Sequence, residues 1–269
     1  MQRTKKGDVT YCRFDKLSGF PEVVHGVFGR GGGVSQGYFA SLNASFTIGD
    51  DQEAVVANRR LLCQALGIPY TSLVVAKQVH GTHVAIIDEA RPVESPEEWY
   101  DLLPPSDGIA TSLRGVNALM TFADCVPLLF FDPTHQAIGI AHGGWKGTVA
   151  KVAEHMVEEM RLAFATNPAH LVVAIGPSIG PCCYEVREDV ISAVRHAFTY
   201  ADDLLVTQPN GSVHFDLWEA NRRQALRVGV LPEHVEVARI CTACNTDVFF
   251  SNRAEKGKTG RFGVVIGLR

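Results

Sequence analysis

The sequence predicts an α+β fold built from mixed β-sheets. Strand-like runs outnumber helical ones, and several follow one another with no helical segment between them. Helical periodicity appears in only four stretches. A parallel sheet made of βαβ units would require strands and helices to alternate regularly. The observed order therefore argues against that alternation and for sheets in which parallel and antiparallel strands mix.

Each of the four helical stretches has apolar residues three or four positions apart, which is typical of a helix with one buried face. Gly67 follows the first stretch as a stop signal. The last stretch opens with Asp216-Leu217-Trp218-Glu219, which resembles a capping box. This predicted helix ends near Gly229. The predicted helices are 51–66, 148–164, 188–198 and 216–229.

The predicted strands are short runs rich in β-branched and aromatic residues. They cover residues 23–28, 73–87, 116–122, 128–131, 137–141, 171–175, 235–240, 248–250 and 262–266. The segment 89–105 contains four prolines and is predicted to be a long surface loop. Because the strands on both sides of this loop read as one core, we expect residues 1–269 to form a single domain.

Composition narrows the class of protein. A chain of 269 residues with 46% apolar content is expected to be globular. The net charge of −4 offers no electrostatic footprint for nucleic acid, and no apolar run approaches the 18 residues of a membrane span. The charged N-terminus is not followed by an apolar stretch, so no secretory signal is predicted. Seven cysteines, an odd number, are read most simply as reduced thiols in a cytoplasmic protein.

Three short polar motifs interrupt the apolar runs and place a metal-capable or nucleophilic side chain beside a predicted strand. Two histidines and one cysteine are too few for an iron–sulfur cluster. They are the right number for a catalytic zinc ion, which takes three protein ligands and leaves one position open. The motifs are Gln78-Val79-His80-Gly81, Ala123-Asp124-Cys125-Val126-Pro127 and Ala141-His142-Gly143-Gly144-Trp145.

Counting across a predicted hairpin brings two of these residues together. Residues 132–135 look like a turn, and if the hairpin is centred near Thr134, His142 lies opposite Val126 and one position from Cys125. Neighbouring strands lie about 4.8 Å apart, so the two side chains are within reach of a shared metal or of each other. A slip of one residue would turn them to opposite faces.

Each of these residues also has a purely structural explanation. Cys125 is explained as a small buried apolar residue, and His142 as a turn or capped core residue. His80 and His83 would face opposite ways on a strand, so only one of them is expected at a site. Elsewhere, the Cys-x-x-Cys at 241–244 lacks a second ligand pair, and the adjacent cysteines 182–183 have no metal-like spacing.

The glycine-rich segment 143–148 leads from a predicted strand into a predicted helix. Free backbone N–H groups at such a junction can hold an anion. The segment matches neither the P-loop nor the dinucleotide-binding fingerprint, so a phosphate-binding role does not follow from the motif alone.

Taken together, these stretches resemble the laccase-domain family that includes YfiH, YlmD and LACC1. The match begins near Val24 and continues to the C-terminus. Its local departures are Asn252, where the family commonly has an aromatic residue, and Cys244. The matching segments are 29–35 (GRGGGVS), 40–43 (ASLN), 78–81 (QVHG), 123–127 (ADCVP), 141–147 (AHGGWKG), 175–177 (IGP), 183–186 (CYEV), 249–253 (FFSNR) and 259–261 (TGR).

The resemblance implies an α+β fold in which two mixed β-sheets pack together with flanking helices, as in YfiH and in cysteine-hydrolase toxins of the CNF1 type. It implies a zinc site at His80, Cys125 and His142, with Cu²⁺ as the alternative metal. It also implies purine nucleoside phosphorylase activity on adenosine, inosine and S-methyl-5'-thioadenosine, with an adenosine deaminase side activity. The expected partners are therefore purine nucleosides and phosphate, with no nucleic acid and no membrane.

The resemblance also suggests roles for residues around the zinc site. We expect His80, Cys125, His142 and Asp124 to be catalytic. Asp124 would either orient a ligand, carry a proton or accept structural hydrogen bonds in the interior. The expected substrate contacts are Arg30, Asn43, Gln78, Lys146 and Arg253. By residue type and position, the candidates for phosphate are Arg30, Lys146 and the turn at 143–147.

The histidine content of the chain does not fit the copper-oxidase activity that the name laccase suggests. A four-copper oxidase needs many histidine ligands, largely in His-x-His pairs, and this chain has no His-x-His. An open-position zinc suits deamination of a purine, whereas phosphorolysis needs a held phosphate and a protonated leaving group. Two other hypotheses stay open at this point. One is a cysteine hydrolase or deamidase that uses Cys125 with His142 as its base, and the other is a non-catalytic metal-binding module.

Overall fold

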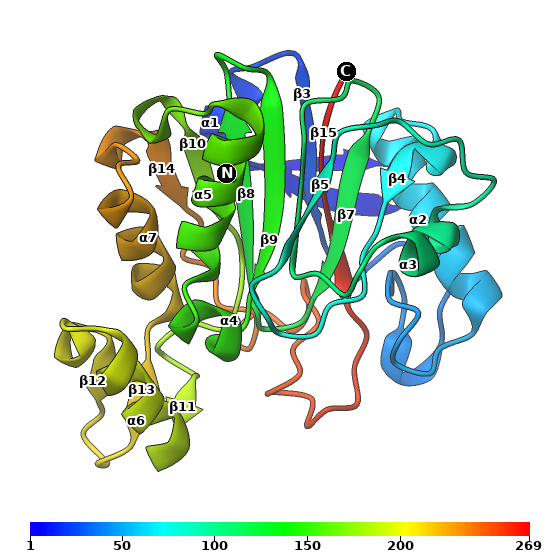
Figure 1. The fold of residues 1–269 in the computed structure, drawn as a ribbon. Coiled ribbons are helices and arrows are strands. Elements are labelled where there is room, and N and C mark those ends of the chain that lie inside the picture. The colour runs from blue at the N-terminus through cyan, green and yellow to red at the C-terminus, as the bar shows by residue number, and fades with distance from the viewer.

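The computed structural model describes residues 1–269 as two six-stranded mixed sheets, with helices outside them and a small three-stranded sheet at one end (Figure 1). The predicted α+β class is confirmed. Strands of the two large sheets contribute to one apolar cluster, and β9 contacts both β15 and β7 across the interface. None of the helices combines the length and apolar character that crossing a bilayer requires.

The first sheet is antiparallel except at one edge, where β4 runs parallel to β7. Its order is β1-β2-β3-β15-β7-β4. The bounds are β1 Gln2–Lys6, β2 Val9–Arg13, β3 Val23–Phe28, β15 Phe262–Leu268, β7 Asn117–Phe122 and β4 Leu73–Val74.

The second sheet has a parallel pair at each edge and antiparallel strands in the middle. Its order is β14-β10-β8-β9-β6-β5. The bounds are β14 Val235–Val237, β10 Val172–Ile175, β8 Val126–Asp132, β9 Ala137–Gly143, β6 Gly108–Thr111 and β5 Val84–Ile87. The small sheet has the order β11-β13-β12, with bounds Glu185–Val186, Val213–Phe215 and Leu205–Thr207.

α5 and α7 cover the second sheet, α2 lies against the first, and α6 lies beside the small sheet (Figure 1). α5 packs on β9 and on α7, whereas α2 contacts β2 and β3 of the first sheet. The bounds are α1 Asp15–Ser18, α2 Gln52–Leu66, α3 Trp99–Leu102, α4 Trp145–Val149, α5 Val152–Phe164, α6 Glu188–Ala197 and α7 Leu217–Arg227.

The ends of α2 follow from its sequence. The Asp51 side chain accepts hydrogen bonds from the backbone N–H groups of Glu53 and Ala54, which satisfies donors that have no partner within the helix. Gly67 ends the helix in the left-handed conformation, with φ of 71°, which a residue with a side chain adopts at a cost. The predicted helix 148–164 is instead two helices, α4 and α5, because Lys151 takes a φ of 69° between them.

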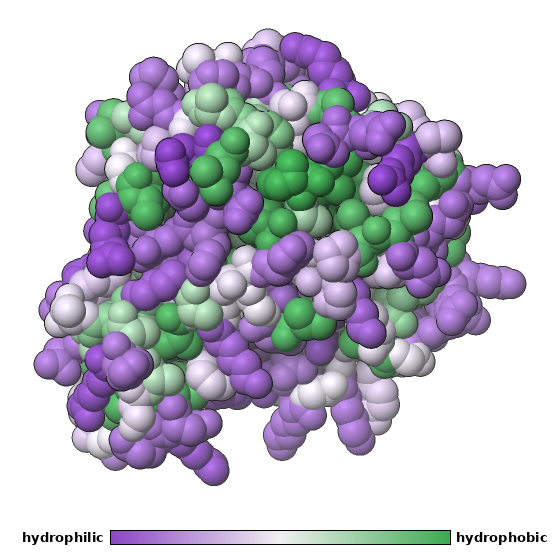
Figure 2. Space-filling model, viewed as in Figure 1, coloured by the Kyte–Doolittle hydropathy of each residue, from purple (hydrophilic) through white to green (hydrophobic).

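Two apolar clusters stabilise the molecule. The larger lies between the two sheets and includes Phe122, Phe131 and Phe262, which are almost completely buried. The second lies between the second sheet and its covering helices, and there Met156 and Trp218 contribute. In the view of Figure 2, apolar residues gather in the upper middle of the face, around the position of β5 in Figure 1, and hydrophilic residues cover the rim.

Several predicted strands differ from the structure. Residues 73–87 form no continuous strand, because β4 and β5 are separated by a loop at 75–83. Residues 248–250 form no strand, and β1, β2, β6 and the small sheet were not predicted. The loop at 75–83 is apolar enough to resemble a strand, but its backbone donors bind a side chain rather than a neighbouring strand, as described below.

Candidate active site

His80, Cys125 and His142 meet at one end of the second sheet. Cys125 directly precedes β8, His142 lies near the end of β9, and His80 lies in the loop between β4 and β5. Their ligand atoms all lie within 4.8 Å of one another, and the two imidazole centroids are 4.8 Å apart. The structure therefore brings together the three side chains that the motifs indicated, including His80, which counting along the hairpin could not place.

The register of the β8–β9 hairpin differs by one residue from the prediction. Val126 pairs with Gly143 rather than with His142, so the predicted pairing was wrong. The cause lies in the turn, where Gln136 adopts a left-handed φ of 52° and adds one residue before β9. The side chain of Asp132 stabilises this longer turn by accepting backbone hydrogen bonds from the turn residues.

Cys125 reaches His142 because it does not belong to the strand. The preceding residue, Asp124, has a φ of 85°, a conformation that a residue with a side chain rarely adopts. This bend redirects the chain just before β8 begins, so the strict alternation of a strand no longer decides where the Cys125 thiol points. The one-residue error in register therefore does not separate the two side chains.

Asp107 organises the site, and sequence reasoning missed it. Its carboxylate is fully buried and lies 2.8 Å from Nδ1 of His142. It also accepts hydrogen bonds from the backbone N–H groups of Val79, His80 and Gly81, at 3.1, 3.0 and 2.7 Å. Burial alone would raise the pKa of this carboxyl, but the hydrogen bond from His142 and those from the loop lower it.

The contacts of Asp107 have two consequences. They hold His80 in a left-handed conformation with φ of 63°, which directs its ring to the site. They also engage Nδ1 of His142, so that Nε2 is the ring nitrogen left for a ligand. His83, the other half of the His-x-x-His spacing, instead contacts the Ser106 hydroxyl at 2.9 Å.

Cys125 and His142 stabilise each other in their charged forms. Burial favours the neutral thiol, but the positive charge of His142 and hydrogen bonds from His142 and His80 lower the pKa of Cys125 to about 6. Burial likewise disfavours a charged imidazole, yet the Cys125 thiolate and Asp107 raise the pKa of His142 to about 9. The two groups therefore favour the ion pair of a thiolate and an imidazolium over the neutral pair.

Asp124 makes structural hydrogen bonds. One carboxylate oxygen accepts from the hydroxyl of Thr242 at 2.7 Å, and the other accepts from the backbone N–H of Arg253 at 2.6 Å. These contacts join the bend before β8 to the segment 242–253. Of the roles expected for Asp124, its geometry favours the one in which it accepts hydrogen bonds in the interior.

Gly144 lets the three donor side chains approach one another closely. A Cβ atom at this position would lie 3.1 Å from the Cys125 sulfur and 3.1 Å from a ring carbon of His80. Contacts this short would force one of the side chains to move. The second glycine of the Ala141-His142-Gly143-Gly144 motif therefore serves close packing beside the donors, in addition to starting α4.

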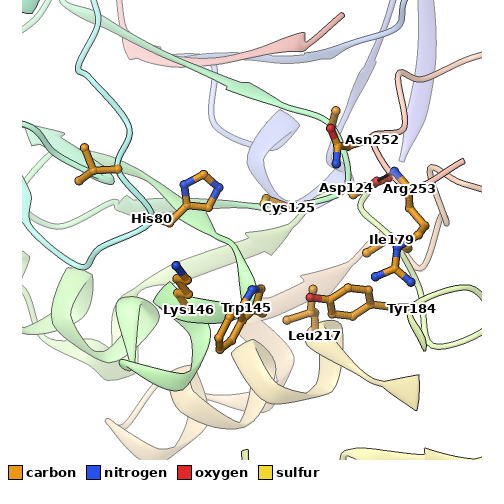
Figure 3. A pocket seen from close by; sticks show the side chains of 12 residues that line it. His80, Asp124, Cys125, Trp145, Lys146, Ile179, Tyr184, Leu217, Asn252 and Arg253 are labelled. Atoms are coloured by element: carbon orange, nitrogen blue, oxygen red, sulfur yellow. Dashed lines mark hydrogen bonds between the residues drawn. The ribbon is translucent and has the colours of Figure 1, made fainter. Parts of the chain in front are cut away.

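Two cavities, of about 430 and 390 Å³, meet at His80 and Cys125. Both volumes lie in the range of small-molecule sites. Figure 3 shows the first cavity, with His80 and Lys146 on one side and Tyr184 and Arg253 on the other. Trp145 and Leu217 are among its apolar lining residues. The donors therefore border space that a small molecule can enter.

Lys146 and Arg253 are the two predicted substrate contacts that line the first cavity and end in a positive charge. Both are exposed. The Arg253 guanidinium packs over the Tyr184 ring, 5.1 Å from its centroid, and donates to the carbonyl of Glu185. The Lys146 ammonium lies 5.7 Å from the Trp145 ring centroid. Both groups keep donors that are free to contact an anion.

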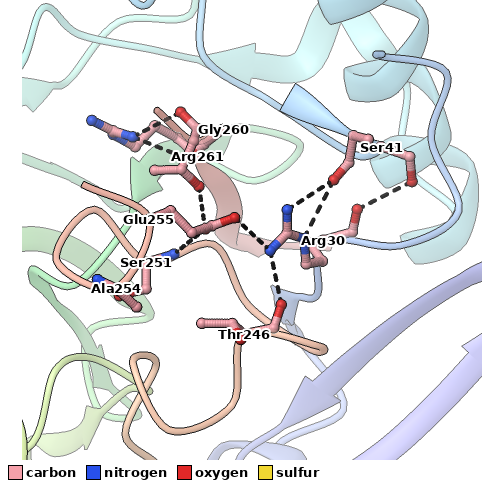
Figure 4. A network of polar contacts seen from close by, with 10 residues as sticks. Arg30, Ser41, Thr246, Ser251, Ala254, Glu255, Gly260 and Arg261 are labelled. Atoms are coloured by element: carbon pink, nitrogen blue, oxygen red, sulfur yellow. Dashed lines mark hydrogen bonds and ion pairs between the residues drawn. The ribbon is translucent and has the colours of Figure 1, made fainter. Parts of the chain in front are cut away.

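Arg30 lies away from both cavities, in a polar network (Figure 4). Its guanidinium pairs with Glu255 at 3.0 Å and donates to the carbonyl oxygens of Thr246 and Ala40. It also packs over the Phe250 ring. These contacts use its donors for holding loops together, so the position gives no support to a phosphate contact.

Asn43 and Gln78 also make backbone contacts. Asn43 is completely buried and accepts from the N–H groups of Ser45 and Arg261. Gln78 exchanges two hydrogen bonds with the backbone of Thr121, although its side chain borders the second cavity. Of these two predicted substrate contacts, only Gln78 therefore lies where a ligand could reach it.

Arg261 borders the second cavity together with Cys125 and His142, and the prediction did not assign it a role. Its guanidinium donates to the carbonyls of Thr259 and Gly260 and to the side chain of Asn252. The one sequence signal for a role of Arg261 was its position in the segment 259–261, which matches the family. A structural or a functional arginine would have produced the same pattern.

Comparison with known proteins places the chain in a family. The model described as multi-copper polyphenol oxidoreductase laccase matches residues 24–269. The purine nucleoside phosphorylase YlmD of Geobacillus stearothermophilus is 39% identical over 93% of this chain and 92% of its own. A protein named adenosine deaminase RL5, from an unknown prokaryotic organism, is 33% identical over 83% of this chain and 85% of its own.

The fold agrees with that placement. The crystal structure of YlmD from Geobacillus stearothermophilus superposes with a TM-score of 0.89 at 36% identity, covering 99% of this chain and 98% of that one. The matched region contains all three donor motifs. The chain therefore belongs to the multi-copper polyphenol oxidoreductase laccase family, whose relatives named above are a purine nucleoside phosphorylase and an adenosine deaminase.

Proposed function

We propose that this protein is a zinc-dependent purine nucleoside phosphorylase that acts on adenosine, inosine and S-methyl-5'-thioadenosine, with an adenosine deaminase side activity. The observation that carries the proposal is the convergence of His80, Cys125 and His142 within 4.8 Å beside two cavities. The names of the two relatives supply the reaction classes.

The donor set fits zinc. Two imidazoles and one thiolate with an open fourth side form the type of set used by catalytic zinc sites. The hydrogen bond between Asp107 and His142 adds the carboxylate–histidine pair that commonly orients such a ligand. When bound, zinc would supply a Lewis acid at the junction of the two cavities. These donors also accommodate Cu²⁺, so metal analysis of the purified protein decides between the two.

The chain's own residues would bind and orient the reactants. Trp145 and Tyr184 offer aromatic surfaces in the first cavity, against which a purine can stack. Lys146 and Arg253 bring positive charge to the same cavity, and Arg261 brings it to the second. Charged donors suit phosphate, which phosphorolysis must hold beside a neutral sugar.

A cysteine hydrolase is the second candidate, and one observation favours it. Asp107, His142 and Cys125 form an acid–base–nucleophile series in which the base is oriented by a buried carboxylate. Tightly bound stoichiometric zinc would argue against this reading, because a ligated thiolate is not a free nucleophile. The third hypothesis, a non-catalytic metal-binding module, requires that no turnover occurs.

The deciding experiment incubates metal-analysed protein with adenosine, with and without inorganic phosphate, and identifies the products by mass. Adenine and ribose 1-phosphate that appear only with phosphate support phosphorolysis, and inosine supports deamination. Absence of both products from zinc-loaded protein would refute the proposal. That residues 1–269 form a single domain, and that the protein is cytoplasmic, remain predictions.

A further inference from the structure

Four of the seven cysteines lie together in a cluster separate from His80, Cys125 and His142. The sequence offered no second ligand pair for Cys241 and Cys244, and that reading was wrong. The structure places Cys182 and Cys183 against them, and the ligand atoms of all four lie within 4.8 Å of one another. Because 57 residues separate the two pairs along the chain, spacing could not reveal this cluster.

The geometry of the cluster matches metal coordination. The sulfur of Cys244 lies 3.6 Å from that of Cys182 and 3.3 Å from that of Cys183. Four sulfurs at about 2.3 Å from a tetrahedral zinc ion would be separated by about 3.8 Å. A disulfide would instead bring one pair to about 2.05 Å, and all seven cysteines are free thiols in this structure.

The surroundings of one sulfur, that of Cys241, suit a thiolate. The backbone N–H of Gly180 donates to the sulfur of Cys241 at 3.3 Å, and Cys241 is buried. A thiolate sulfur is a better acceptor of such bonds than a thiol. No acidic or basic side chain makes a hydrogen bond or ion pair with the four sulfurs. A divalent cation would therefore be the natural source of compensating charge for several thiolates.

We propose that Cys182, Cys183, Cys241 and Cys244 bind a second zinc ion in a closed four-thiolate site with a structural role. Four thiolates fill the tetrahedral positions of zinc and leave none open for a substrate. This inference does not depend on the proposed enzymatic activity.

Such a site would fasten together two segments that form one wall of the first cavity. Ser178 and Cys241 already form an isolated β-bridge beside it. Tyr184 directly follows the first cysteine pair, and Arg253, nine residues after Cys244, packs over its ring. The metal would thus restrain the side of the cavity that lies opposite His80 in Figure 3.

The test is a count of metal ions on the full chain, purified under reducing conditions and measured by elemental analysis and native mass spectrometry. Wild-type protein is expected to carry two zinc ions per chain. Cys125→Ala/His142→Ala should retain one, and Cys182→Ser/Cys244→Ser should also retain one. Cys12→Ser is the matched control, because Cys12 is a half-buried cysteine outside both clusters, and it should retain two.

Cobalt(II) gives a second readout that does not depend on activity. In Cys125→Ala/His142→Ala protein the remaining ion should show the intense thiolate charge-transfer absorption of a tetrahedral four-sulfur site. One zinc in wild type and none in that double variant would overturn the proposal, as would a mass two hydrogens lighter from a disulfide in the reduced preparation. If the Cys182→Ser/Cys244→Ser variant fails to fold, the count in the other double variant still decides.

Discussion

The two donor clusters of this protein differ in what holds them. His80, Cys125 and His142 are three donors at the end of a central antiparallel strand pair, and they face two cavities. The four cysteines lie on two loop segments outside the large sheets, with no cavity bordered by their side chains among those described above. Three donors with an open side suit catalysis, whereas four closed donors suit structure.

The two clusters also differ in the source of their geometry. The protein itself fixes the first cluster, through Asp107 and the backbone bends at His80 and Asp124. The second has few fixed supports apart from the Gly180 contact and the Ser178 bridge, so a metal would supply much of its order. Substitutions in and around the two clusters test this contrast.

Removing one ligand of the first cluster should abolish both reactions. In Cys125→Ala or His142→Ala, zinc should be lost from this site, and phosphorolysis and deamination should both fall to background while the fold persists. Product analysis by mass, with circular dichroism to check folding, measures this. Loss of one reaction alone would show that phosphorolysis and deamination use separate sites. The first cluster would then not be the single catalytic site.

Changing Asp107 should weaken the first cluster without removing a ligand. Asp107→Asn keeps the size of the side chain but removes its negative charge. The carboxylate orients His142 and accepts hydrogen bonds from the three loop N–H groups. Outer partners of this kind typically contribute about 10- to 100-fold in metal affinity or activity. Zinc titration against a chelator should show such a loss at one site only. An unchanged zinc affinity would mean that Asp107 is not needed to position the three donors.

Lys146→Ala should affect phosphorolysis selectively. A charge-assisted contact to phosphate contributes roughly 1.5–3 kcal/mol, or about ten- to hundredfold. We expect the apparent KM for phosphate to rise by that order, whereas deamination should fall much less. Arg30→Ala is the comparison, because Arg30 is engaged in the loop network and should change both reactions alike through stability. Equal losses in both reactions for Lys146→Ala would refute its phosphate role.

The fourth prediction concerns pH and a residue outside both clusters. Burial, aided by the charge of Arg13, lowers the pKa of His25 from 6.5 to about 4, and its Nε2 accepts the backbone N–H of Phe14. The unfolded chain therefore binds a proton between these values and the folded one does not, so stability falls as pH drops from 6.5 toward 4, by up to about 3 kcal/mol.

In His25→Gln this part of the acid sensitivity should disappear, as measured by denaturant midpoints at pH 7 and pH 5 in protein treated with a chelator. Chelation removes any contribution from metal release at either cluster. If wild type and variant lose stability in parallel, His25 does not carry the effect, and another group that titrates between pH 5 and pH 7 does.

The sequence predicted the fold class and most long elements, because apolar periodicity and capping signals are local. The stop at Gly67 lies where it was predicted, and residue 51, the predicted start, is the N-cap of α2. The break at Lys151 and the extra turn residue at Gln136 were not predictable, since each depends on a single left-handed residue that is not glycine.

The site was predictable only in part. The three donors could be predicted, because histidine and cysteine stand in recognisable motifs. Asp107 did not, because one aspartate in a loop carries no local signal of the three N–H groups that converge on it from residues 79–81. The four-cysteine cluster was hidden for a similar reason, since its halves meet only after the chain has folded. Arg30 illustrates the reverse, a motif residue whose geometry serves the scaffold.

The carboxylate of Asp107 has one further consequence. It fixes the backbone that carries His80 and the ring of His142 at once, through contacts made entirely within the protein. The first cluster is thus preorganised: the entropy of ordering its loop is lost during folding rather than on capture of the ion. Metal should then enter and leave without large rearrangement, and the chain should stay folded when this ion is removed.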